Sequence, residues 1–239
     1  PSAPLSAVSG TSLLTCQSNR FRDASTNNFA ITAAGNTSVT AFSPFILAYP
    51  GYTTATNGGS GYFNGSSDYL SLGATSAFSI ATSSTPFTLE GWIYPTAAGG
   101  CIFSEAYTGS GNVDIALIMA DGTTYETNGL YVTLAYYNGA FGLTRANTPV
   151  PLNAWTHVAA VFTGSTSKIY YNGVDVTAAS PITSWATAGS SGNGWYVGKR
   201  WDTPGAPYIS YFSGYISNFR FVNGTAVYTC LLYTSDAAD

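Results

Sequence analysis

The glutamates and the single histidine are the residues that could catalyse a hydrolysis. The chain has three glutamates, Glu90, Glu105 and Glu126, and one histidine, His157. Two carboxylates that cleave a glycosidic bond with retention lie about 5 Å apart, a separation that residues two positions apart on one strand can reach. No glutamate here has an acidic neighbour at that spacing. His157 lies in the apolar segment 155–162, where burial and one hydrogen bond satisfy a neutral imidazole. We therefore predict that the chain is not an enzyme.

A calcium ion would need six to eight oxygen ligands. The acids that lie closest to one another in the sequence are Asp114, Asp121 and Glu126. Asp121 precedes Gly122, and Asp-Gly is chiefly a turn signal, so solvated turn acids are favoured over a metal site. We expect no cofactor, and these three acids stay the candidates if calcium binds.

Aromatic rings gather in and beside the loop 199–207, where two prolines restrict the backbone. Flat aromatic faces stack on the C–H surfaces of sugar rings, while polar neighbours bond the sugar hydroxyls. The same rings could instead pack the loop or contact a neighbouring subunit, because protein interfaces are also rich in aromatics. Both interpretations stay open. The candidate glycan-binding residues are Trp201, Asp202, Tyr208, Tyr211, Tyr107 and Tyr125.

The composition excludes several classes of partner. Charged residues make up only 8% of the chain, against about a quarter in an average soluble protein. Solubility must therefore come from Ser, Thr, Asn, Gly and Tyr, which suits an extracellular or virion-surface protein. The net charge is −4 and the seven basic residues are scattered, which argues against nucleic acid. No apolar run approaches the length that spans a bilayer, so we expect no membrane insertion.

Two of the three cysteines belong to the part of the chain that we expect to be native. Residues 230–239, which include Cys230, match the translation of an adapter used in sequencing libraries, so we expect them not to be native. Cys16 and Cys101 remain. Nothing requires a disulfide in a domain with this much core, and we expect two buried thiols.

Short segments with alternating side chains and many aromatic or β-branched residues predict an all-β chain with almost no α-helix. Asn-Gly turns at 64–65, 138–139 and 172–173 predict antiparallel pairing of their flanking strands, and a Gly-Asn turn at 35–36 predicts another hairpin. The expected strands include 11–16, 29–32, 38–42, 61–64, 68–72, 87–94, 101–104, 113–119, 129–137, 141–143, 155–162, 168–171, 195–198 and 211–222.

Three of these segments carry a family resemblance. Residues 87–94 (FTLEGWIY), 155–174 (WTHVAAVF running into KIYYNGV) and 211–221 (YFSGYISNFRF) resemble the laminin-G-like jelly rolls of the concanavalin A-like lectin and glucanase superfamily. The resemblance covers roughly residues 60–229. It implies a two-sheet antiparallel jelly-roll β-sandwich and carbohydrate binding. The superfamily's glucanases carry a Glu-x-Asp-x-x-Glu motif or a close variant, which this chain lacks.

The resemblance also implies a domain arrangement. Residues 61–229 would form the jelly roll, and residues 1–60 a linker followed by first strands that join the same sandwich. Residues 12–16 should then pair with a strand far along the chain. Trp155 is also expected in the core. The other expected core residues are Trp92, Phe87, Leu89, Val158, Phe162, Ile216 or Phe219, and Phe221.

Residues 13–32 resemble the segment between tandem repeats of phage and marine-virus structural proteins. This implies an adhesion module on a virion or cell surface, with glycans and neighbouring repeats as partners. One alternative is a decoration or assembly domain of a virion or filament that binds no glycan. Another is a degenerate glycan hydrolase that uses Glu90, although a hydrogen-bonding role of Glu90 is favoured. At 214–218 the chain reads GYISN where the family often has two aspartates, which removes a family calcium site.

Overall fold

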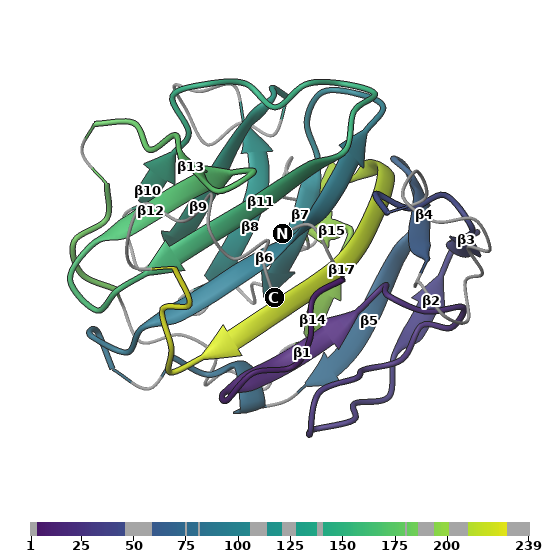
Figure 1. Ribbon diagram of the computed structural model, residues 1–239, viewed down its shortest axis with the longest axis horizontal. Coiled ribbons are helices and arrows are strands. Elements are labelled where there is room, and N and C mark those ends of the chain that lie inside the picture. The colour runs from purple at the N-terminus through teal and green to yellow at the C-terminus, as the bar shows by residue number, and fades with distance from the viewer. Residues whose placement is uncertain are drawn as a thin grey trace, which may run out of the picture.

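The computed structural model describes residues 4–45, 59–74, 76–80, 82–105, 114–120, 128–137, 141–179, 181–185, 194–200 and 210–228. Two antiparallel β-sheets lie face to face, as Figure 1 shows. Within the described ranges the only helical segment is the short 3₁₀ turn η2 (Ser76–Phe78). None of the helical structure in these ranges has the length or the apolar character needed to cross a membrane. The expected all-β sandwich is confirmed.

The front sheet is the one nearer the viewer in Figure 1. Its strands lie in the order β13-β12-β11-β6-β17-β4-β3, and β1 also pairs with β17. The bounds are β1 (Thr11–Thr15), β3 (Ser38–Thr40), β4 (Ser60–Asn64), β6 (Phe87–Pro95), β11 (Thr156–Phe162), β12 (Ser167–Tyr171), β13 (Val174–Asp175) and β17 (Ser213–Asn223).

The back sheet has the order β10-β9-β8-β7-β14-β5-β2. A separate two-stranded ribbon, β15 (Lys199–Arg200) with β16 (Ser210–Tyr211), leaves it after β14. The bounds in the back sheet are β2 (Thr32–Ala34), β5 (Tyr69–Ala74), β7 (Cys101–Glu105), β8 (Asp114–Ala120), β9 (Tyr131–Tyr137), β10 (Phe141–Arg145) and β14 (Gly194–Val197).

The N-terminal strand β1 pairs with β17, more than 200 residues along the chain. Leu13 faces Phe221 and Thr15 faces Phe219 in an antiparallel register. Figure 1 shows β1 beside the C-terminal half of β17. The expected pairing of residues 12–16 with a distant strand is confirmed.

Two of the expected hairpin connections are present. Asn172 and Gly173 both have positive φ, 49° and 83°, as a type I′ turn requires, and Tyr171 pairs with Val174 across them. Strands β9 and β10, which flank the Asn-Gly at 138–139, also pair with each other.

The hairpins expected at 64–65 and 35–36 are wrong. Strand β4 belongs to the front sheet and β5 to the back sheet, and β2 and β3 are likewise in different sheets. Asn64 Oδ1 accepts the backbone N–H groups of Ser66 and Ser67, both at 2.9 Å, which widens its turn into a corner. The buried Asp68 carboxylate accepts the N–H of Asn36 at 2.7 Å and that of Asn64 at 3.1 Å, so one side chain holds both corners.

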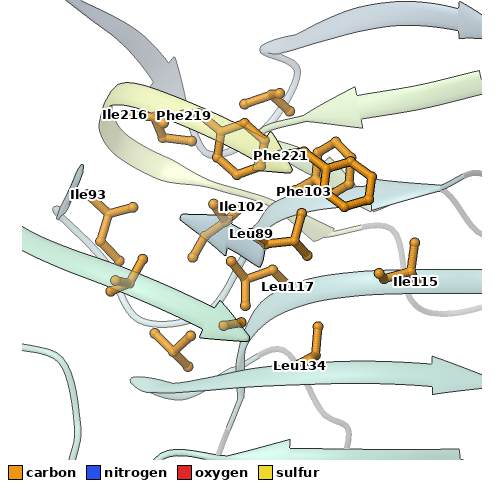
Figure 2. Packing of buried hydrophobic residues seen from close by; sticks show 14 of the residues in the cluster. Leu89, Ile93, Ile102, Phe103, Ile115, Leu117, Leu134, Ile216, Phe219 and Phe221 are labelled. Carbon is orange, nitrogen blue, oxygen red and sulfur yellow. The ribbon is translucent and has the colours of Figure 1, made fainter. Parts of the chain in front are cut away.

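The core fills the space between the inner faces of the two sheets, as Figure 2 shows. Most of the expected core residues are confirmed there, with both Ile216 and Phe219 buried. The expected core positions of Trp92 and Trp155 are wrong. Trp92 is only half-buried and contacts Phe45 and His157 on the outer face, because Leu89 and Ile93 occupy the inward positions of β6. The confirmed residues are Phe87, Leu89, Val158, Phe162, Ile216, Phe219 and Phe221.

Trp155 is also outside the core. It is half-buried on the outer face, against Phe42 and Tyr94. The tryptophans that do fill the core are Trp185 and Trp195, each 1% exposed.

The two thiols are buried as expected. Cys16 is 2% exposed and Cys101 is fully buried, with its Sγ 3.3 Å from the carbonyl oxygen of Phe103. Burial raises the pKa of the Cys16 thiol to about 12, so it stays protonated and chemically inert at neutral pH.

Candidate functional site

The ribbon β15–β16 leaves the back sheet at Gly198. This residue has φ +85°, and a Cβ placed on it would lie 2.4 Å from the ring of Phe63. Only glycine can therefore occupy the position without displacing a core ring. The Gly198 N–H donates to the carbonyl of Ile102 at 2.9 Å, which fixes the end of β14. The next residue, Lys199, pairs with Tyr211 across the ribbon.

Three tyrosines surround the ammonium group of Lys199. Its Nζ lies 4.2 Å from the ring centre of Tyr69, 5.4 Å from that of Tyr196 and 5.6 Å from that of Tyr211. Tyr69 packs edge-on against Tyr196, with ring centres 5.5 Å apart. Lys199 is 2% exposed, whereas all three tyrosines are half-buried. We call Tyr69, Tyr196, Tyr211 and Lys199 the tyrosine patch.

The patch is composed of neutral rings around one cation. Burial raises the pKa of the Tyr196 and Tyr211 hydroxyls, with a smaller contribution from Tyr69, so neither ionises at neutral pH. Burial lowers the pKa of Lys199. A cation within about 6 Å of an aromatic ring is held by the negative ring face, an effect of about 0.5–2 kcal/mol. The patch therefore offers partly exposed ring faces and hydroxyl groups that both donate and accept hydrogen bonds.

Of the sequence-predicted site residues, Tyr211 belongs to this patch. Asp114 opens β8, where it pairs with Tyr137, and nothing is described of its side chain. The others lie outside the described residues. They are Trp201, Asp202, Tyr208, Tyr107, Tyr125, Asp121 and Glu126. The ribbon β15–β16 nevertheless forms the stem of the segment 201–209, which carries three of them.

Sequence reasoning missed Tyr69, Tyr196 and Lys199 as site residues. A local signal existed, because Tyr196 lies between the core residues Trp195 and Val197 and must face outward. What no local pattern shows is that β5 pairs with β14, which places Tyr69 against Tyr196. In the described part of the chain, no three His, Cys, Asp or Glu side chains are grouped to hold a metal ion.

A second group of polar side chains lies on the outer face of the front sheet. Glu90 accepts Arg220 Nε at 2.9 Å and Nη2 at 2.5 Å through its Oε1. Its Oε2 lies 3.2 Å from His157 Nε2 and accepts the Tyr228 hydroxyl at 2.5 Å. Glu90, His157 and Arg220 are at most 4% exposed. We call these four residues the buried cluster.

The electrostatics of the buried cluster keep Glu90 ionised and His157 neutral. Burial favours the protonated carboxyl, but the hydrogen bond from His157 and the charge of Arg220 outweigh it and hold the pKa of Glu90 below its ordinary value. Burial lowers the pKa of His157, against the opposing pull of Glu90. Because an ionised carboxylate only accepts, the His157 Nε2 carries the proton. The expected hydrogen-bonding role of Glu90 and the buried position of His157 are both confirmed.

Comparison with known proteins agrees with this architecture. A laminin-G family model, described as the concanavalin A-like lectin/glucanases superfamily, matches residues 64–226. The chain belongs to this family. No curated protein matches it in sequence.

Several solved structures share the fold. Domain 4 of AbnA, a GH43 extracellular arabinanase from Geobacillus stearothermophilus solved with arabinotriose, is 19% identical with a TM-score of 0.60. The match covers 90% of this chain and 94% of that domain. The botulinum neurotoxin serotype C1 binding domain is 13% identical with a TM-score of 0.59, over 94% of this chain and 53% of that one.

A further botulinum neurotoxin type C structure, described as dependent on two ganglioside molecules for cell entry, is 12% identical with a TM-score of 0.55. It matches over 91% of this chain and 49% of its own. The chain thus spans about half the length of the toxin domains. At these identities the likeness shows the fold alone, and it agrees with the jelly roll described above.

Proposed function

We propose that the chain is a non-catalytic carbohydrate-binding module whose site is built on the tyrosine patch. The observation that carries the proposal is the set of three half-buried tyrosine rings around Lys199, at the stem of the segment that holds Trp201, Asp202 and Tyr208. The family and the two sugar-related neighbours, one solved with arabinotriose and one linked to gangliosides, support it.

The chemistry of the patch suits a sugar ring. The C–H face of a pyranose or furanose packs on a tyrosine face, and the phenol hydroxyls bond the sugar hydroxyls at the rim. Trp201 would add a second stacking surface and Asp202 a hydrogen-bond acceptor. We propose no catalytic role because Glu90, the one candidate catalyst, is buried. Its carboxylate oxygens are bonded to Arg220, His157 and Tyr228 and are not accessible to a substrate.

The strand register favours Tyr125 over Tyr107 as a further member of this site. Val197 of β14 faces Phe103, and Cys101 faces Ile118, so the ends of β14, β8 and the start of β7 lie at one edge of the back sheet. β8 ends at this edge with Ala120, five positions before Tyr125. β7 ends at the opposite edge with Glu105, two positions before Tyr107.

The proposed setting is a virion or cell surface, where the chain would act as one unit of a tandem array. Single sites of this kind bind with dissociation constants of about millimolar to micromolar, and repeats raise avidity through effective concentration. The extracellular arabinanase domain and the toxin binding domains support a surface role.

A glycan array tests the proposal. We expect the full chain, displayed as a multimer, to retain a defined set of glycans, and Trp201→Ala and Tyr211→Ala to lose them. Tyr62→Ala is the matched control, since Tyr62 is also half-buried but lies on the front sheet against Tyr215. If no glycan binds the multimer, or if Trp201→Ala and Tyr211→Ala both bind as the wild type does, the decoration or assembly role replaces this proposal.

A further inference from the structure

A pocket lies at the far end of β17 from the tyrosine patch. Tyr211 precedes the start of β17, and Asn223 ends it, so about ten residues at about 3.3 Å each separate the two places by roughly 30 Å. In Figure 1 the end of β17 and the start of β1 lie together at the same side of the molecule. The cavity volume is about 670 Å³, within the range of small-molecule sites. The lining residues are Ala7, Val8, Ser9, Gly10, Thr11, Ser12, Thr26, Asn27, Ala77, Ser79, Thr85, Asn223 and Gly224.

One wall of the pocket is the turn that enters β1. Thr11 closes this turn twice, since its N–H donates to the Val8 carbonyl at 3.0 Å and its hydroxyl accepts the Val8 N–H at 2.8 Å. Gly10 has φ +80° and its carbonyl accepts the Asn223 N–H at 2.9 Å. A Cβ on Gly10 would lie 2.5 Å from the Asn223 carbonyl oxygen. The backbones of the two segments are therefore too close for any side chain at position 10.

Two amide side chains hold the remaining walls in place. Asn223 Nδ2 donates to the Ser79 carbonyl at 2.9 Å, which ties the end of β17 to the segment after η2. Asn27 Nδ2 donates to the Ser12 carbonyl at 3.0 Å, which fixes the orientation of that amide. Its Oδ1 makes no hydrogen bond within the described ranges, and Asn27 is exposed. The pocket is therefore preformed and keeps a free acceptor at its rim.

The chemistry of the lining selects the class of ligand. None of the lining residues that the structure describes is charged or aromatic. Among these described residues, an anion or a cation finds no countercharge and a flat aromatic ligand finds no ring to stack on. The exposed polar side chains of the lining, Ser9, Thr26 and Asn27, carry hydroxyl and amide groups that both donate and accept, which matches a neutral polyol. We propose that this pocket is a second binding site, separate from the tyrosine patch, for one neutral sugar residue.

Two sites at opposite ends of β17 would let one domain hold two sugar chains, or one chain that crosses the domain. The pocket does not need the tyrosine patch, because the two share no residue. Recognition would also differ, because the patch offers aromatic rings for stacking, whereas the described lining of the pocket offers small apolar groups beside hydroxyls and amides.

Chemical-shift titration of the ¹⁵N-labelled full chain tests the second site. The probes are glucose, galactose, arabinose and N-acetylglucosamine, each raised to about 100 mM to cover millimolar affinity. We expect at least one of them to shift the amides of Thr11, Ser12, Asn27 and Gly224 in a saturable way. We expect glucuronate and glucosamine, which carry charges, to shift them at least fivefold less.

Two exposed positions supply the variants. Thr26→Arg places bulk and charge in the pocket, and Asn27→Ala removes the acceptor, while the Ser12 carbonyl still accepts the Ser25 hydroxyl. Both should weaken the pocket shifts at least fivefold. Tyr211→Ala should leave these shifts unchanged even if it abolishes glycan binding at the patch, so the two proposals fail separately. The second site is wrong if no neutral sugar shifts these amides, if the charged sugars bind as well, or if Thr26→Arg has no effect.

Discussion

The buried cluster and the tyrosine patch place the same kinds of group on the outer faces of opposite sheets, but with different exposure. Each contains a buried basic side chain and at least one tyrosine. In the cluster, Arg220 bonds Glu90 and also donates to the carbonyl of Ser6 in the N-terminal segment. Tyr228 covers the same carboxylate from the C-terminal side. In the patch, Lys199 is buried but the three tyrosine rings around it remain half-exposed.

This difference in exposure indicates a structural role for the buried cluster and a recognition role for the tyrosine patch. The cluster uses its hydrogen-bonding capacity internally, and the segments before β1 and after β17 close over it, so it fastens the ends of the domain to the front sheet. The patch leaves ring faces and hydroxyls at the surface. A group of charged and aromatic residues is therefore a candidate binding site only when its faces reach solvent.

The largest expected effect is the loss of the Glu90 carboxylate. Glu90→Ala leaves Arg220 buried without its anion, and breaking one side of such a pair costs about 3–5 kcal/mol. Urea denaturation should show this loss in the free energy of unfolding. The matched change in the patch, Tyr211→Ala, should leave the unfolding midpoint close to the wild-type value. Equal losses from the two variants would contradict the contrast between the regions.

Acid should weaken the cluster in two steps. Burial holds the pKa of His157 below its ordinary value of 6.5, against the opposing pull of Glu90. As the pH falls below 6.5, His157 takes up a proton in the unfolded chain but not in the folded protein. The free energy of unfolding therefore decreases as the pH is lowered. The pKa of Glu90 is also lowered from 4.5, so its contribution is lost as the pH falls below that value.

Unfolding measured between pH 7 and pH 3 checks both steps. His157→Gln, which cannot titrate, should remove the first loss and keep the second. A wild-type stability that is flat from pH 7 to pH 5, or that rises, would show that His157 is not buried as a neutral imidazole.

Removal of one patch ring should weaken glycan binding without unfolding the domain. Tyr69→Ala and Tyr211→Ala each delete one stacking face, worth about 0.5–1.5 kcal/mol beyond area burial, so we expect roughly two- to twelvefold weaker binding. Calorimetry with the best glycan from the array measures this. Tyr211→Phe keeps the ring and should lose less than Tyr211→Ala. The reverse order would assign the binding to the hydroxyl instead of the ring.

The smallest effect belongs to an exposed ion pair between β12 and β13. Lys168 Nζ lies 2.9 Å from Asp175 Oδ2, with side chains 41% and 27% exposed. Exposed pairs contribute about 0–1 kcal/mol because water screens them. Lys168→Ala should lower the free energy of unfolding by at most about a third of the loss seen for Glu90→Ala. A comparable loss would mean that burial does not decide the strength of these pairs.

Local pattern was sufficient for most of the strands, the family and the favoured role of Glu90. The strand expected at 29–32 is wrong, because the strand in this region, β2, begins only at Thr32. Side chains that alternate with a period of two predict that a segment is a strand with two unlike faces, and the Asn172–Gly173 turn carries its own hairpin geometry in its positive φ angles. The three segments at 87–94, 155–174 and 211–221 were enough to identify the superfamily that the match over 64–226 shows.

Tertiary structure alone decided which face each strand buries and which strands meet. Trp92 alternates as regularly as Leu89, yet it lies outside the core, because alternation does not say which set of side chains faces the other sheet. Asn64–Gly65 became a corner since the buried Asp68 ties it to Asn36 across the sheets. The tyrosine patch joins β5, β14, β15 and β16, which are up to 142 positions apart, and the pocket joins both ends of the chain's described part. Contacts at such separations depend on the sheet order, and no window of sequence contains that order.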